Sequence, residues 1–197
     1  MTLQEIPSES ISERSLPVLE TERLALRAPC LGDVKPLAAL ANDRRIAENT
    51  ARIPHPYRAR DARQFINAAN HGSETVFVIT GQGAVLGACG LMQHDDEPAE
   101  IGYWLGAKHW GQGYATEAVR ALIDHAFADL DHETLQSAAR VTNPASRRVL
   151  EKCGFQWTGV GLQRIRALNS SAPIDRFRLD RGLWASLKSW GGAKRVA

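Results

Sequence analysis

The stretch HWGQGYATEA, residues 109–118, contains the residues whose types and spacing most directly suggest chemistry. Gly111 and Gly113 precede a run with helical periodicity. A helix N-terminus exposes unpaired backbone N–H groups and carries about half a positive charge, so small residues there let a phosphate approach. The alternative is a turn in which glycine serves only a positive φ angle. The stretch therefore predicts either an anion-binding helix start or a turn.

Two common phosphate-binding motifs do not fit this stretch. A dinucleotide-binding motif needs a third glycine where the chain has Thr116. A nucleoside-triphosphate loop needs a lysine and a hydroxyl residue where the chain has Gln112 and Gly113. The spacing therefore excludes both of these nucleotide-binding classes.

Longer segments around the glycines resemble a known family. AEIGYWLGAKHWGQGYATEAVRALIDHAF, followed by RVTNPASRRVLEKCGF, resembles the acetyl-CoA-binding core of GNAT-superfamily N-acetyltransferases. LETERLALRA is similar to the first strand of the branch that contains the ribosomal-protein alanine N-acetyltransferases. The resemblance covers about residues 18–182 and implies acetyl-CoA as the co-substrate.

The resemblance also implies which residues bind CoA. The backbone amides of residues 111–116 are expected to hold its pyrophosphate. The CoA-binding residues that it implies are Leu105, Trp110, Gly111, Gln112, Gly113, Tyr114, Ala115, Thr116 and Asn143. Trp110 departs from the family pattern, which usually has glutamine or arginine there. Asn143, followed by proline, also has the sequence of a helix N-cap, and the two roles are compatible.

Acetyl transfer to an amine needs a base for the amine's proton and a proton for the departing thiolate. The resemblance implies Glu100 as the base, directly or through water; the alternative is a solvent-facing strand glutamate. Many GNAT enzymes use a tyrosine as the proton donor, but its position here is Leu150. The resemblance then indicates Ser146, which is equally explained as a polar residue in the first turn of a helix. Water is a further source of that proton.

Other reactive residues predict no further chemistry. HDDE, residues 94–97, forms a turn in which contiguous side chains diverge, and we expect no metal site there or elsewhere. Cys153 is expected to be a packed thiol rather than a nucleophile. Tyr103 and Trp104 are adjacent in a predicted strand, so one is expected to face the core and the other the cofactor or substrate.

Hydrophobic periodicity predicts the elements that position these residues. Strands are predicted over residues 19–28, 75–80, 85–93, 99–105, 134–141, 155–162 and 176–179. Helices are predicted over residues 32–43, 61–69, 115–130 and 144–153, with a further short helix over 182–190. Glu117 is expected on the outward face of its helix. We predict an α/β fold of the GNAT type, with a mixed, mostly antiparallel sheet of about seven strands flanked by about four helices. The resemblance implies that the sheet splays between the strands near Leu105 and Thr134.

Composition limits the remaining possibilities. A length of 197 residues fits one domain, expected over residues 18–190, with a flexible leader over 1–17 and a tail over 191–197. The 24 basic and 22 acidic residues lack the excess of charge typical of nucleic-acid binding. No apolar run reaches the roughly 18 residues of a membrane helix. Three widely spaced cysteines and no secretory leader predict free thiols in the cytoplasm.

Together these observations predict an N-acetyltransferase that transfers acetyl from acetyl-CoA to a primary amine by direct attack in a ternary complex. The expected partner is an amine acceptor, either a small molecule or a protein N-terminus, and neither nucleic acid nor membrane. A homodimer is compatible with the sequence. The alternatives are a non-catalytic acyl-CoA-binding or sensor module and a transferase of a longer acyl group.

Overall fold

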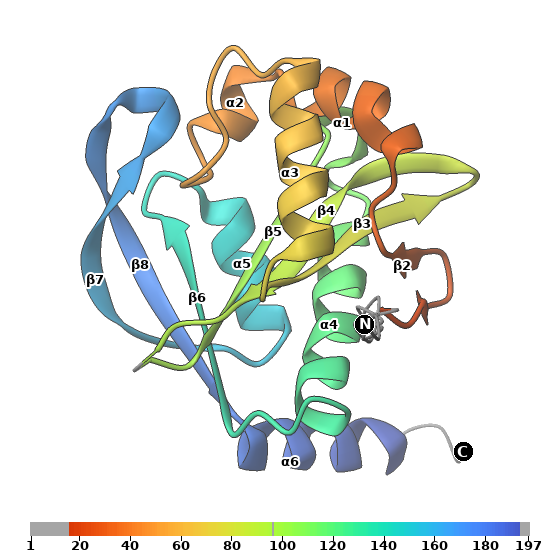
Figure 1. The fold of residues 1–197 in the computed structure, drawn as a ribbon. Helices are drawn as coiled ribbons and strands as arrows, with labels where there is room; N and C mark the ends of the chain where they lie inside the picture. The colour runs from red at the N-terminus through yellow and green to blue at the C-terminus, as the bar shows by residue number, and fades with distance from the viewer. Residues whose placement is uncertain (1–15, 96, 194–197) are drawn as a thin grey trace, which may run out of the picture.

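The computed structural model describes residues 16–95 and 97–193. The chain forms an open eight-stranded sheet with helices on both faces (Figure 1). The strands are β1 (Leu19–Glu20), β2 (Ala25–Arg27), β3 (Thr75–Gly81), β4 (Ala84–Met92), β5 (Ala99–Leu105), β6 (Thr134–Arg140), β7 (Gln156–Ile165) and β8 (Ser170–Asp180). Their order is β1-β2-β3-β4-β5-β6-β8-β7, and only the β5–β6 pair is parallel. The predicted fold class is confirmed.

The helices cover the two faces of this sheet unequally. They are α1 (Val34–Ala41), α2 (Arg44–Ala47), α3 (Ala59–His71), α4 (Tyr114–Ala128), α5 (Pro144–Lys152) and α6 (Arg181–Ala193), with short 3-10 turns η1 (Leu31–Asp33), η2 (Ala107–His109) and η3 (Arg166–Leu168). Figure 1 shows α1 and α3 on one face and α4 on the other. Helix α2 was not predicted because one turn is too short for a periodic signal.

Several predicted boundaries differ from the structure. The strand expected over residues 19–28 is two strands, because the backbone turns where the N–H of Thr21 donates to the carbonyl of Leu24. The last strand starts at Ser170 rather than near 176, because β8 pairs with β7 along a long hairpin from Ser170 onward, and this pairing extends the strand beyond the segment that the local pattern indicates. Of the expected leader only residues 16 and 17 are described, and residues 194–197 of the expected tail lie outside the described part of the chain. Helix α6 continues to Ala193, beyond the expected boundary at 190.

The core lies on both faces of the sheet. Helix α4 buries Ala118, Val119, Leu122 and Ile123 against one face, which confirms the predicted apolar stripe. A smaller cluster forms on the other face between α1, α3 and β3. No helix among the described residues is long and apolar enough to cross a bilayer.

Strands β5 and β6 pair over a very short distance. Their register contains only Ala99 with Leu135 and Glu100 with Gln136, although each strand has seven residues. Just beyond, the Ser137 hydroxyl donates to the Ile101 carbonyl at 2.8 Å. The two strands then separate, which confirms the predicted splay and opens the sheet next to the starts of α4 and α5.

Candidate active site

The start of α4 presents unpaired backbone donors. Gly113 is the N-cap and has a φ of 82°, and Gly111 has a φ of 75°. The first helical hydrogen bond runs from the Glu117 N–H to the Gly113 carbonyl, so the amides of residues 114–116 have no partner within the helix. The N-cap residue, a glycine, has no side chain that could cap the helix. We call residues 111–116 the glycine segment; its geometry is that of an anion-binding helix start.

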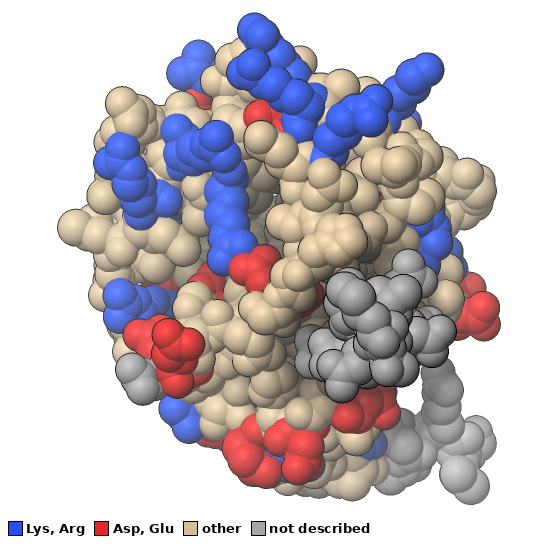
Figure 2. Space-filling view, viewed as in Figure 1, with Lys and Arg blue, Asp and Glu red and all other residues tan. Residues whose placement is uncertain are grey.

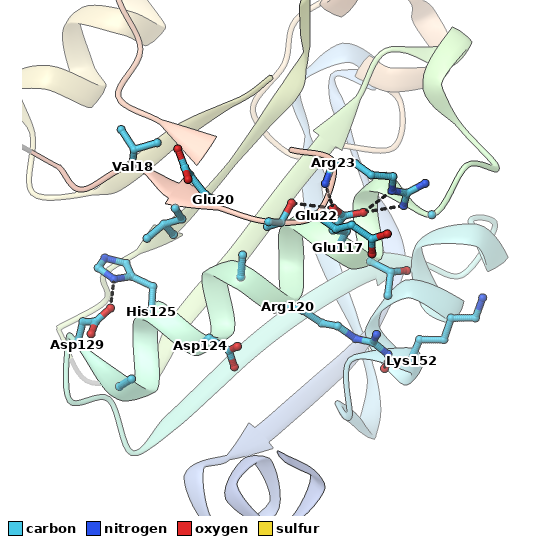
Figure 3. Close-up of a pocket in the computed structure, with 16 residues that line it drawn as sticks. Val18, Glu20, Glu22, Arg23, Glu117, Arg120, Asp124, His125, Asp129 and Lys152 are labelled. Carbon is cyan, nitrogen blue, oxygen red and sulfur yellow. Dashed lines mark hydrogen bonds and ion pairs between the residues drawn. The ribbon is translucent and has the colours of Figure 1, made fainter. Parts of the chain in front are cut away.

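The turn between β1 and β2 holds the glycine segment in place. The hydroxyl of Thr21 and the backbone N–H of Arg23 donate to Glu117 Oε1 at 2.7 and 2.8 Å. The Arg23 guanidinium forms an ion pair with Glu117 Oε2 at 2.6 Å (Figure 3). The same guanidinium donates to the Gln112 carbonyl at 3.0 Å. It also lies 4.6 Å from the centre of the Tyr114 ring.

Glu117 therefore differs from its predicted environment. It was expected on the outward face of its helix, but only 16% of its side chain is exposed, because the β1–β2 turn covers it. Burial by itself would raise the pKa of Glu117, but the hydrogen bonds from Thr21 and Arg23 outweigh burial and lower this pKa. The local helical pattern could not predict contacts from a turn more than ninety residues earlier.

An outer hollow of about 860 Å³ extends from the glycine segment along α4. Gly113 and Thr116 line it beside the β1–β2 turn. Arg120 and Lys152 lie further along the same hollow, where the Arg120 guanidinium donates to the Lys152 carbonyl at 2.9 Å (Figure 3). Carboxylates also line this hollow, so it combines the backbone at Gly113 and Thr116 with side chains of both charges; the acidic ones are Glu20, Glu22, Glu117, Asp124 and Asp129.

Three other residues predicted to bind CoA, Leu105, Trp110 and Gln112, take part in hydrogen bonds within their own loop. Leu105 is buried in the core, and its carbonyl accepts the Trp110 indole N–H at 2.8 Å. Trp110 is 45% exposed, and the Arg45 guanidinium lies 5.4 Å from the centre of its ring. The Gln112 side chain donates to the Lys108 carbonyl at 3.1 Å. Trp110, the departure from the family pattern, thus holds the loop against the end of β5.

Ala115 lies in the first turn of α4 and packs against the core. The carbonyl of Thr116, one residue later, accepts a hydrogen bond from the Cys153 thiol at 3.7 Å. Cys153 is buried, and burial raises its pKa to about 11, which disfavours the thiolate. The predicted packed thiol is confirmed.

A second cavity, of about 530 Å³, lies between α3 and the parted strands β5 and β6; we call it the sheet cavity. Glu100 and Ser146 both line it, so the structure brings together the two candidate catalytic residues. Glu100 and Tyr103 differ by an odd number of positions in β5 and therefore lie on opposite faces of the sheet. Both line the cavity, which is thus accessible from both faces where the strands part.

Glu100 has the environment of a general base. Its side chain is only 23% exposed, unlike the solvent-facing alternative. Burial raises the pKa of Glu100, and His94, whose Nε2 lies 3.5 Å from Glu100 Oε2, opposes that rise. A raised pKa brings a carboxylate closer to the operating pH, where it accepts a proton more effectively.

Ser146 is held from two sides. Asn143 Oδ1 accepts the Ser146 backbone N–H at 3.1 Å, which confirms the predicted N-cap of α5. The Tyr103 and Ser146 hydroxyl oxygens lie 2.8 Å apart, and Tyr103 also donates to the Ser146 carbonyl at 3.1 Å. Burial raises the pKa of Tyr103, which keeps its hydroxyl protonated. Leu150, where many GNAT enzymes have a tyrosine, is fully buried in the core.

Tyr103 is one of two neighbouring aromatic residues of which one was expected to face the cofactor or substrate, and the sequence did not decide which. Strand alternation predicted that Tyr103 and Trp104 face opposite sides, and Trp104 does pack with the α1–α3 cluster. No local pattern relates Tyr103 to Ser146, which is 43 residues away. No group of three metal-ligating side chains is found within residues 16–95 and 97–193; Asp96, part of the HDDE stretch, lies outside the described residues.

The family model that matches the chain is the acetyltransferase (GNAT) domain, over residues 23–156. The chain belongs to the GNAT acetyltransferase family. It is 35% identical over 149 residues to an uncharacterized N-acetyltransferase, p20, of Bacillus licheniformis, covering 72% of this chain and 84% of that protein. It is 29% identical over 159 residues to the ribosomal-protein-serine acetyltransferase of Escherichia coli, covering 77% and 88%.

One solved structure with the same fold is also that of a ribosomal-protein acetyltransferase. The ribosomal L7/L12 α-N-protein acetyltransferase RimL, in complex with coenzyme A, superposes with a TM-score of 0.73 at 21% identity, over 83% of this chain and 98% of that one. The predicted family is confirmed, and these relatives are consistent with the predicted branch. The GNAT protein described here is an N-acetyltransferase.

Proposed function

We propose that this GNAT enzyme transfers acetyl from acetyl-CoA to a primary amine, of a small molecule or a protein N-terminus, by direct attack in a ternary complex. The observation that carries the proposal is the sheet cavity, which Glu100 lines from one face and the Tyr103–Ser146 pair from the other. We further propose that it acts in the cytoplasm, where its cysteines, all free, stay reduced.

The glycine segment is the proposed site for the pyrophosphate of CoA. A Cβ atom at Gly111 would meet nothing within 4 Å, so the backbone there is open to a ligand. A Cβ atom at Gly113 would meet only Arg23 Nη2, at 3.3 Å. Unpaired amides and an open approach favour a phosphate group there. Asn143 is proposed to contact CoA as well, through the part of its amide not used in the cap.

In the proposed reaction the amine nitrogen attacks the thioester carbonyl and Glu100 takes the proton that the nitrogen loses. An α-amine, with a pKa near 8, needs less help to become neutral than a lysine side chain near 10.4. The carbon–sulfur bond then breaks, and the thiolate takes a proton at the Tyr103–Ser146 pair or from water. Alcohols are weak acids, so this pair acts mainly by donating a hydrogen bond to the sulfur. Holding both reactants in one cavity supplies much of the acceleration, roughly 7–11 kcal/mol in favourable geometry.

Glu100→Gln tests the proposal. Given acetyl-CoA and a panel of primary amines and N-terminal peptides, the wild type is expected to release free CoA thiol with at least one acceptor. The variant is expected to turn over about 10²- to 10⁴-fold more slowly and to bind acetyl-CoA as tightly as the wild type. Thiol release is followed colorimetrically, the product by mass spectrometry, and cofactor affinity by calorimetry.

The pH profile identifies the role of Glu100. Because its pKa is raised, wild-type kcat/KM should rise with pH through a value above the usual glutamate range, and this limb should be absent from Glu100→Gln. Glu133→Gln, which removes an exposed carboxylate that pairs with Arg181 outside the cavity, is the control. Equal rates for wild type and Glu100→Gln would remove Glu100 from the mechanism. Acetyl-CoA binding without thiol release from any amine would instead favour the sensor alternative.

A further inference from the structure

The sheet cavity carries positive charge at the end distant from Glu100. Arg140 lies four residues after Gln136, the register partner of Glu100, which is about 13 Å along β6 at roughly 3.3 Å per residue. Its side chain is on the same face of the sheet as Glu100, because paired parallel residues share a face and alternate positions repeat it. Arg166, in η3, lines the same cavity.

The hydrogen bonds place these two arginines beside one segment. The Arg140 guanidinium donates to the Glu48 carbonyl at 2.8 Å, and the Arg166 backbone N–H donates to the Ala51 carbonyl at 3.0 Å. Both arginines therefore border the segment that follows α2. Figure 2 shows basic side chains gathered on the part of the molecule that carries α2 and the β7–β8 hairpin, with acidic side chains lower on the same face.

The three arginines that line the cavity, Arg52, Arg140 and Arg166, differ in their ion pairing. Arg52, a third arginine lining the cavity, pairs with Glu74 at 2.6 Å. Among the described residues, no carboxylate forms an ion pair with Arg140 or Arg166, and the buried Nε of Arg140 has no acceptor. A buried guanidinium donor without an acceptor is costly, which favours a ligand or water oxygen at this end of the cavity.

We propose that the acceptor amine carries an anionic group, a carboxylate or phosphate several bonds from the nitrogen, which Arg140 and Arg166 bind while the amine lies at Glu100. The separation of the two ends excludes a simple α-amino acid as the best fit, because its amine and carboxylate are only two bonds apart. An arginine binds carboxylate and phosphate through paired N–H donors and repels a cation. A polyamine is therefore a poor substrate.

This inference rests on the proposed function and adds the substrate class to it. Two kinds of acceptor combine an amine with a distant anionic group: a peptide with an acidic residue near its N-terminus, and a small amino acid with a distant carboxylate. The first is tested with amidated peptides that begin Ala-Glu, Ala-Gln or Ala-Lys and are otherwise identical. The second is tested with 6-aminohexanoate and its amide.

Arg166→Glu and Arg164→Glu form a matched pair of variants. Both residues are exposed and lie two positions apart, but Arg164 does not line the cavity and donates to Asn169 at 2.7 Å. Arg166→Glu is expected to raise KM for the acidic acceptors about tenfold or more and to leave the neutral ones unchanged. It should lower KM for the Ala-Lys peptide, and acetyl-CoA affinity should not change. Arg164→Glu should behave as the wild type. Arg166→Gln should show the same trend to a smaller extent.

The proposal is overturned if the wild type has equal KM values for acidic, neutral and basic acceptors, or if Arg166→Glu changes all three alike. A lower KM for Ala-Glu than for the other peptides would indicate a peptide acceptor, and a lower KM for 6-aminohexanoate than for its amide would indicate a small amino acid. If no amine releases thiol, the proposed function fails, and calorimetric titration of the same compounds into CoA-saturated protein still decides the charge preference. Equal affinity for the acidic and amide forms in that titration would overturn the proposed preference for an anionic group.

Discussion

The glycine segment and the sheet cavity are two binding regions built in different ways. The glycine segment is contiguous in sequence, and its donors are backbone amides at the start of α4. The sheet cavity is formed by side chains from the segment after α2, from β5 and β6, and from η3. Backbone donors depend on conformation, whereas the cavity depends on which side chains several distant segments bring together. The comparison suggests that acetyl-CoA binding depends on the φ angles of the glycine segment, and that the choice of acceptor amine depends on the charge of the sheet cavity.

The first test of this comparison is Gly111→Ala, paired with Gly83→Ala. Gly111 and Gly83 have φ values of 75° and 74°, and a Cβ atom at either would meet nothing within 4 Å. Both variants should therefore lose similar stability through left-handed strain, about 1–2 kcal/mol. Only Gly111→Ala should weaken acetyl-CoA binding, by about tenfold to a hundredfold, the effect of losing a charge-assisted hydrogen bond of about 1.5–3 kcal/mol.

Thermal unfolding measures the shared strain of these two variants, and calorimetry with acetyl-CoA measures the difference between them. Because Gly83 lies in the turn between β3 and β4, it controls for strain away from the proposed site. Equal acetyl-CoA affinity in the two variants would mean that the glycine segment is a structural turn.

Tyr103→Phe and Ser146→Ala test the hydroxyl pair that lines the sheet cavity. Each change removes one hydroxyl from a pair separated by 2.8 Å. If the pair acts on the sulfur as a unit, each variant should lower kcat about twofold to tenfold, the value of one hydrogen bond. The double variant should lose little more than either single one, because the remaining hydroxyl no longer has its partner.

Steady-state kinetics, with kcat and KM determined separately, measure the losses of the two single variants and of the double variant. A merely structural role would lower thermal stability and leave kcat unchanged. Additive losses in the double variant would show that the two hydroxyl groups act independently.

Glu117→Gln has the smallest expected effect and tests how the glycine segment is held. The variant should lose about 1 kcal/mol of stability, a shift of roughly 2–4 °C in Tm for a chain of this size. The pKa of Glu117 is lowered in the folded protein, so its contribution is complete above the unfolded glutamate pKa, near 4.3. The difference from wild type should therefore shrink as pH falls below that value through the lowered pKa.

Thermal unfolding between pH 3 and pH 7 measures this dependence, with Glu151→Gln as the control. Glu151 pairs with Arg147 on the exposed side of α5, and such exposed pairs contribute less. A stability difference for Glu117→Gln that does not change with pH would contradict the assigned pKa direction.

Much of this fold could be predicted because its signals are local. Strand β5 and the apolar stripe of α4 follow from periodicity, and the N-cap and proline at the start of α5 follow from two adjacent residues. Glu100 and Ser146 were reached through the family resemblance, and the cavity that joins them was not visible in either local pattern.

The sequence by itself determined the family and the position of the glycine segment, because both depend on residues close together in the chain. Only the tertiary structure decided the environments of Glu117, Tyr103 and Arg140. Each is set by a partner between 43 and 96 residues away, across a turn or a parted pair of strands. Burial and charge pairing depend on such long-range contacts, and hydrophobic periodicity contains no information about them.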